Sequence, residues 1–103
     1  MAHRRVVVTG LGCVTPVGNS VSESWDNLLA GRSGITAITR FDASALACRI
    51  AGEVKGFELE KYLSVKDARS MDTFIHYGLA AAIEAVQDAG LPFGEALPPE
   101  LAE

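Results

Sequence analysis

Hydrophobic residues near the N-terminus form an uninterrupted run. Val6, Val7 and Val8 are consecutive and β-branched, with no polar residue between them. Such a run is typical of a strand buried on both faces, as in a parallel sheet covered by helices. We therefore predict a strand over residues 5–12, and the glycines and proline that follow predict a loop up to residue 18.

Helical spacing of apolar residues begins soon afterwards. Ser20 and Glu23 have the spacing of a capping box, in which each side chain satisfies a free amide at the start of a helix. An apolar stripe then recurs at helical intervals over residues 21–30, and Gly31 can adopt the left-handed conformation that ends a helix. The pattern predicts a first helix over residues 21–30.

A longer helix is predicted over residues 72–89, ending at Gly90. Its middle, residues 78–83, carries no charge on any face, which is typical of a buried helix. Gly78 costs about 1 kcal/mol of helix propensity relative to alanine, so we expect close backbone packing there. The proline-rich residues 92–103 are predicted to form a surface loop.

The segments between these helices are shorter. Residues 32–47 are predicted to be irregular, whereas alternation over residues 48–54 predicts a half-exposed strand. One or two helical turns are expected over residues 58–63. Ser64 and Asp67 then have cap spacing and predict a short helix.

These elements do not supply enough partners for one another. The valine strand needs a neighbour on each edge, and a parallel sheet needs a further strand after a crossover. The long helix is also too apolar to lie on the surface of so small a domain. The pattern therefore predicts an α/β fold in which residues 1–103 are an incomplete part of a larger protein, with the second core strand missing.

Composition narrows the class of protein. The chain has 103 residues, of which 49% are hydrophobic and 21% charged, as in globular proteins. Its net charge of −4 does not favour electrostatic binding of nucleic acid. No apolar run approaches the roughly 20 residues that span a membrane, and the valine run is too short for a signal peptide. We expect a cytoplasmic protein with no membrane insertion.

The valine run leads into Gly10 and Gly12, which suggests a dinucleotide-binding loop. The third glycine of that fingerprint would stand at Thr15, which Pro16 follows. The first predicted helix also begins some eight residues after Gly12, too late to direct its N-terminus at a pyrophosphate. The sequence therefore gives little support to a dinucleotide cofactor.

Cysteines and histidines are few and scattered. Cys13 follows the predicted strand at a glycine-rich turn, where a nucleophile could sit, but no histidine is placed to activate it. Cys13 and Cys48 are therefore interpreted as buried thiols. His76 is interpreted as a partly buried packing residue of the long helix, and neither it nor His3 has a metal-ligand partner at helical spacing. We predict no metal site and no cofactor.

One basic pair remains. Lys66 and Arg69 are three residues apart and share a face of the short predicted helix. They form either a solvated helix face or a docking point for an acidic partner. The residues alone leave both interpretations open.

A further pattern comes from six stretches, taken in order along the chain. They are Arg4-Arg5-Val6-Val7-Val8-Thr9-Gly10-Leu11-Gly12, Thr15-Pro16-Val17-Gly18-Asn19, Trp25 with Leu28-Leu29-Ala30-Gly31-Arg32-Ser33-Gly34-Ile35, Phe41-Asp42, Ala51-Gly52-Glu53-Val54-Lys55, and Met71-Asp72-Thr73-Phe74-Ile75-His76-Tyr77-Gly78. In sequence and spacing they resemble the elongating, type II β-ketoacyl-[acyl-carrier-protein] synthases of bacteria. The resemblance covers nearly the whole chain.

This resemblance implies a thiolase-like fold, in which two βαβαβαββ halves form a five-layered α-β-α-β-α molecule. Residues 1–103 would be the N-terminal part of the ketosynthase N-terminal domain. The family elongates fatty acids by decarboxylative condensation of an acyl chain, held on a cysteine, with malonyl-acyl-carrier-protein, and two histidines stabilise the carbanion. It works as a homodimer without metal or organic cofactor.

The resemblance assigns no catalytic residue to this chain. The family's nucleophile lies in a Thr-Ala-Cys type of motif further downstream, which neither Cys13 nor Cys48 matches, and its catalytic histidines lie further on still. Lys66 and Arg69, by contrast, match basic positions that meet the acidic carrier protein in the family. A third basic position of the family is occupied here by Ser70.

Three alternatives share these features. One is a polyketide ketosynthase, which has the same N-terminal motifs. Another is a non-catalytic paralogue of the chain-length-factor kind, whose active cysteine is lost. The third is a stand-alone carrier-binding module, and the apolar long helix argues against it.

Overall fold

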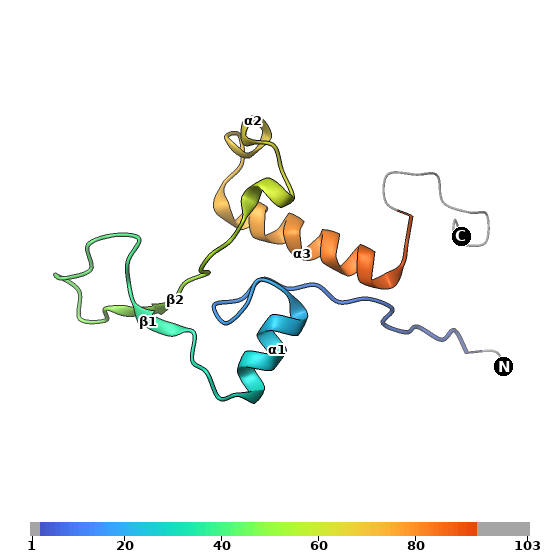
Figure 1. Cartoon of the computed structure of the whole chain (residues 1–103), viewed down its shortest axis with the longest axis horizontal. Coiled ribbons are helices and arrows are strands. Elements are labelled where there is room, and N and C mark those ends of the chain that lie inside the picture. The colour runs from blue at the N-terminus through green and yellow to red at the C-terminus, as the bar shows by residue number, and fades with distance from the viewer. Residues whose placement is uncertain (1–2, 93–103) are drawn as a thin grey trace.

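The computed structural model describes residues 3–92, which form three α-helices, one 3₁₀ turn and a two-stranded sheet. Figure 1 shows the N-terminal segment running between α1 and α3, and α2 at a tip of the molecule. The loop of residues 38–49 projects as an arm, with the two strands at its base. The elements are α1 (Val21–Leu29), β1 (Ile35–Ala37), β2 (Ile50–Gly52), η1 (Leu59–Lys61), α2 (Val65–Ala68) and α3 (Thr73–Ala89). The loop predicted over residues 92–103 lies outside the described residues beyond Pro92.

Helix α1 begins and ends where the sequence predicts. The Ser20 hydroxyl accepts a hydrogen bond from the amide of Glu23 at 3.2 Å, which satisfies one of the free donors of the first turn. Ala30 caps the C-terminus, and Gly31 follows with a φ of 72°. The predicted helix over residues 21–30 is therefore confirmed to within one residue.

Helix α3 also has its predicted ends. The Asp72 carboxylate accepts a hydrogen bond from the Thr73 amide at 2.7 Å, and Gly90 closes the helix with a φ of 71°. Within the described residues only Ala80 of this helix is fully buried and Phe74 is 71% exposed, so these elements alone do not provide the burial that its apolar middle predicts. The close packing expected at Gly78 is also absent, since a Cβ at that position would meet nothing within 4 Å.

The valine segment is the main departure from the sequence prediction. Residues 5–12 form no strand, and Val6, Val7 and Val8 are 94%, 69% and 79% exposed. A strand is defined by hydrogen bonds to a neighbour, and within residues 3–92 no other strand pairs with this segment. The β-branched run therefore favours an extended backbone but forms no ladder of hydrogen bonds with another strand among the described residues.

Gly10 and Gly12 hold the end of this segment against α3. A Cβ on Gly12 would collide with the carbonyl oxygen of Ala81, and one on Gly10 would collide with that of Ala85. The two backbones therefore approach so closely that only glycine fits. The Asp88 carboxylate of α3 adds to this contact, because its Oδ2 accepts a hydrogen bond from the Leu11 amide at 3.0 Å. The Glu84 carboxylate joins α3 to α1 instead, because its Oε1 accepts from the Val21 amide at 2.7 Å.

Strands β1 and β2 pair antiparallel, with Ile35 opposite Gly52 and Ala37 opposite Ile50. The strand predicted over residues 48–54 is confirmed for its middle three residues. The irregular structure predicted for residues 32–47 is wrong at β1, because alternating Ile and Thr found a partner that lies further along the chain.

Glu53 fixes the start of the loop that leaves β1. Its carboxylate accepts hydrogen bonds from the hydroxyl and amide of Thr39 and from the amide of Arg40. The Thr39 hydroxyl, more than the other donors, lowers the pKa of this carboxyl. Arg40 then donates to the Tyr77 hydroxyl at 2.9 Å, which ties the arm to α3.

Burial is shallow throughout the described residues. The buried hydrophobic residues are three alanines, Ala43, Ala68 and Ala80, and the Cα radius of gyration is 17.9 Å. A compact chain of this length would have a radius near 13 Å. Valines, leucines and isoleucines therefore remain on the surface, which agrees with the prediction that these elements cannot cover one another. None of the helices within residues 3–92 is long and apolar enough to cross a membrane.

Candidate functional site

Helix α2 is a single turn that projects from the molecule. The Ser64 hydroxyl accepts a hydrogen bond from the amide of Asp67 at 3.2 Å, as the cap spacing predicts. The helix buries Ala68, which is 7% exposed, and Arg69 forms its C-terminal cap. Its other side chains face solvent.

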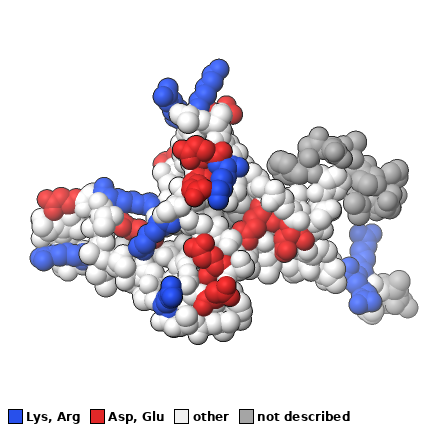
Figure 2. Space-filling model, in the orientation of Figure 1, with Lys and Arg blue, Asp and Glu red and all other residues white. Residues whose placement is uncertain are grey.

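Lys66 and Arg69 are both exposed on this turn. Among residues 3–92 neither side chain has an ion pair or a hydrogen bond, whereas nearby Lys61 is paired with Glu58 at 3.0 Å. Figure 2 shows basic side chains projecting freely from the tip that α2 forms. The structure therefore brings the two predicted docking residues together on one accessible surface.

Ser70 takes no part in that surface. Its hydroxyl donates to the carbonyl oxygen of Asp67 at 2.9 Å and so satisfies the end of α2. The side chain at this position, where the family resemblance implies a third basic residue, is thus used to stabilise the helix end. The basic surface therefore consists of Lys66 and Arg69.

His76 makes a contact that sequence reasoning missed. It is partly buried, as predicted, and its Nε2 lies 3.1 Å from the carbonyl oxygen of Ala68. A carbonyl only accepts, so the ring must carry a hydrogen on Nε2 and donate it. The contact joins two helices across the turn at residues 69–72, and no periodicity within either helix indicates it.

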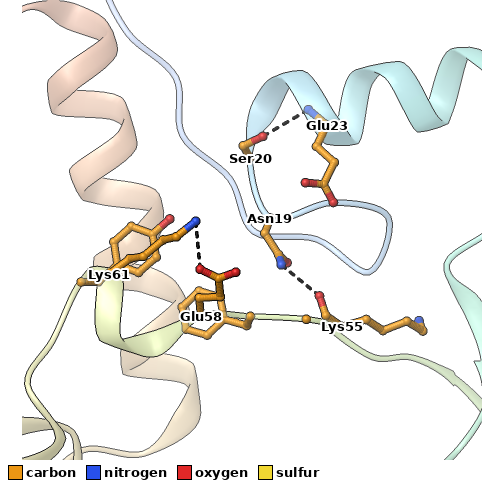
Figure 3. Close-up of a pocket in the computed structure, with 9 residues that line it drawn as sticks. Asn19, Ser20, Glu23, Lys55, Glu58 and Lys61 are labelled. Carbon is orange, nitrogen blue, oxygen red and sulfur yellow. Dashed lines mark hydrogen bonds and ion pairs between the residues drawn. The ribbon is translucent and has the colours of Figure 1, made fainter.

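A polar cavity of about 410 Å³ lies between α1, η1 and the chain that leaves β2. Figure 3 shows three contacts among the residues that line it. Asn19 Nδ2 donates to the Lys55 carbonyl at 2.9 Å, Ser20 caps α1, and Lys61 pairs with Glu58. Its two lysines and two glutamates cancel in charge, so the cavity favours no ion of either sign.

The cysteines and His3 form no reactive centre. Cys13 is half-buried, and among the described residues its thiol is hydrogen-bonded only to the Ser24 hydroxyl, at 3.7 Å. Cys48 was predicted to be buried, which is wrong, because the loop that carries it is on the exposed arm. His3 is exposed. No group of three or more metal-binding side chains occurs in the part of the chain that the structure describes.

Comparison with known proteins gives a consistent result. The family model described as "Beta-ketoacyl synthase, N-terminal domain" matches residues 3–100. The chain is 57% identical over 95 residues to a 3-oxoacyl-[acyl-carrier-protein] synthase 2 of Vibrio cholerae, and 48% identical to the protein of the same name from Synechocystis. Each alignment covers 92% of this chain but 23% of the relative.

A solved structure shares the fold as well. It is described as "The ishigamide ketosynthase/chain length factor" and has a TM-score of 0.76 at 41% identity. The alignment covers 88% of this chain and 23% of the other. The α/β arrangement of helices and small sheet is therefore that of a piece of a ketosynthase, and the chain spans about a quarter of the length of its curated relatives.

Proposed function

Because the chain belongs to the β-ketoacyl synthase family, we propose that it is the N-terminal part of a 3-oxoacyl-[acyl-carrier-protein] synthase of fatty acid biosynthesis. The names of its curated relatives support this activity. The exposed valine segment supports the view that residues 1–103 are an incomplete domain, because a second core strand would cover it. We further propose that the protein acts in the cytoplasm and as a homodimer, as the family resemblance implies.

The chemistry of condensation lies outside these 103 residues in this proposal. Among residues 3–92 the Cys13 thiol is hydrogen-bonded to a serine hydroxyl and to no histidine, and His76 is hydrogen-bonded to a backbone carbonyl. The purified 103-residue chain, incubated with an acyl thioester and malonyl-acyl-carrier-protein, should release no carbon dioxide and form no 3-oxoacyl product. Condensation above the buffer rate would show that the chain holds its own nucleophile.

Lys66 and Arg69 are proposed to dock the acidic acyl carrier protein. The observation that carries this is that both cations are exposed and have no ion pair among residues 3–92, whereas Lys61 is paired with Glu58. An unpaired cation loses no internal partner when it meets a carboxylate of another protein. Complementary charge of this kind sets the rate of encounter and the register of binding.

Charge reversal tests the docking role. In the full-length parent, Lys66→Glu with Arg69→Glu should weaken binding of a purified acyl carrier protein by at least roughly tenfold at low salt. The matched control is Arg4→Glu with Arg5→Glu, which changes the net charge equally at the exposed N-terminus, far from α2 in Figure 1. The control should retain most of the affinity. Equal losses in both pairs would mean that overall charge, rather than this surface, attracts the carrier.

A polyketide ketosynthase or chain-length factor is the alternative that the solved neighbour brings forward. Its identity of 41% is lower than the 57% of the fatty-acid relative. Binding to carrier proteins of both pathways would separate the two. A clear preference for a polyketide carrier would favour the alternative.

A further inference from the structure

Helix α2 is too short to keep a fixed rotation about its axis without contacts to the rest of the molecule. It has four residues, whereas isolated helices shorter than about 12 residues are marginal in water. Successive residues of a helix are about 100° apart around its axis, so a modest rotation of this turn would move Lys66 and Arg69 to another side. Something outside the helix must fix its rotation if the two cations are to face one partner.

His76 is placed to supply that constraint. It lies in the first turns of α3, a 17-residue helix that offers a firm base. Its Nε2–H donates to the carbonyl oxygen of Ala68 at 3.1 Å. The same oxygen accepts the amide hydrogen of Met71 at 3.2 Å, so both of its lone pairs are used.

The bonded residue lies between the two cations. Ala68 immediately precedes Arg69 and follows Lys66 by two positions, and its own side chain is buried. A bond to its carbonyl therefore restrains the rotation of the turn at the level of both charges. Protonation of the ring adds a hydrogen at Nδ1 and leaves this donor in place.

We propose that His76 is a positioning residue that fixes the rotation of α2 through the Ala68 carbonyl and so aims Lys66 and Arg69 at the carrier protein. This inference rests on the proposed docking function of the two cations. It assigns His76 no contact with the carrier. The role requires an N–H donor at this position, not a positive charge.

Two substitutions separate the donor from the ring. His76→Gln keeps an N–H donor on a side chain of similar reach, whereas His76→Phe keeps a ring and removes the donor. Affinity of the full-length parent for acyl carrier protein should fall about fivefold in the Phe variant and stay within about twofold in the Gln variant, as for loss of one hydrogen bond. Amide hydrogen exchange of Arg69 and Met71 should quicken in the Phe variant alone.

A third variant, His76→Leu, supplies a smaller donor-free side chain if the Phe variant does not fold by circular dichroism. Equal affinity in the wild type and the donor-free variant would overturn the proposal. Equal losses in the Gln and donor-free variants would also overturn it, because a bulk effect would then explain both.

A double-mutant cycle distinguishes this inference from the docking proposal beneath it. When Lys66 and Arg69 are already glutamates, removing the donor at position 76 should have no further effect on carrier affinity. If charge reversal weakens binding but the His76 effect is additive to it, docking stands and the positioning role fails. If charge reversal itself has no effect, the docking proposal fails.

Discussion

The N-terminal segment and helix α2 are both joined to α3, but the two joints differ in kind. Gly10 and Gly12 lie directly on the backbone of α3, where a single added carbon would collide. Helix α2 is joined through one side-chain hydrogen bond, from His76 to Ala68, and keeps its charged side chains in solvent. In the first joint two backbones are in contact and leave no room for a side chain, so this joint should govern stability. In the second joint a hydrogen bond sets the direction in which α2 faces, so this joint should govern binding.

The largest expected effect is at the first joint. Gly12→Ala should lower the free energy of unfolding by about 3 kcal/mol, because the new Cβ meets backbone that cannot move aside locally. Urea unfolding followed by circular dichroism measures it. Gly78→Ala is the matched control, since a Cβ there meets nothing within 4 Å and alanine favours the helix by up to about 1 kcal/mol. A neutral Gly12→Ala would mean that the segment does not lie on α3 in solution.

The next effect concerns the carboxylate that α3 offers to α1. Glu84→Gln should cost about 1 kcal/mol of stability, because it removes the charge from a 2.7 Å hydrogen bond at the amide of Val21, the first residue of α1. Asp88→Asn provides the comparison at an exposed 3.0 Å bond to Leu11, and we expect about half the loss. Thermal unfolding of the two variants decides the order. A larger loss of stability for Asp88→Asn than for Glu84→Gln would mean that the bond to Leu11 matters more than the bond to Val21.

The smallest effect on global stability is expected at α2. Ser64→Ala and Ser20→Ala remove N-caps with the same 3.2 Å hydrogen bond, and each loses about 1 kcal/mol locally. In α1 this loss should appear in the unfolding midpoint and leave carrier affinity unchanged. In α2 it should quicken amide exchange over residues 67–69 and weaken carrier binding a few-fold, with little change in the midpoint. The same result from both variants would contradict the view that α2 governs carrier binding while the rest of the structure governs stability.

Local signals in the sequence predicted the helices well. The N-caps at Ser20 and Ser64 are used as their spacing indicates, and Gly31 and Gly90 adopt positive φ after the helices that they end. These signals succeed because a cap is made by atoms within a few residues of one another. The basic pair of the candidate site was predictable for the same reason, since residues i and i+3 of a helix share a face.

Contacts between distant segments were not predictable in this way. Strand β1 was missed because its partner lies about 15 residues away and three residues give no clear alternation. The bond from His76 to Ala68 was missed because it depends on the angle between two helices. Gly10 and Gly12 were placed at the end of the predicted strand, whereas their role is to admit the backbone of α3.

The sequence by itself determined where the helices begin and end, the excess of apolar residues over what these elements can cover, and membership of a recognisable family. Tertiary structure alone decided that the valine run pairs with no strand among residues 3–92, that α3 meets the N-terminal segment through glycines, and which way α2 faces. The physical reason is the range of the interactions. Propensity and capping act over a few residues, whereas ladders, backbone contact and helix rotation depend on segments that the chain must first bring together.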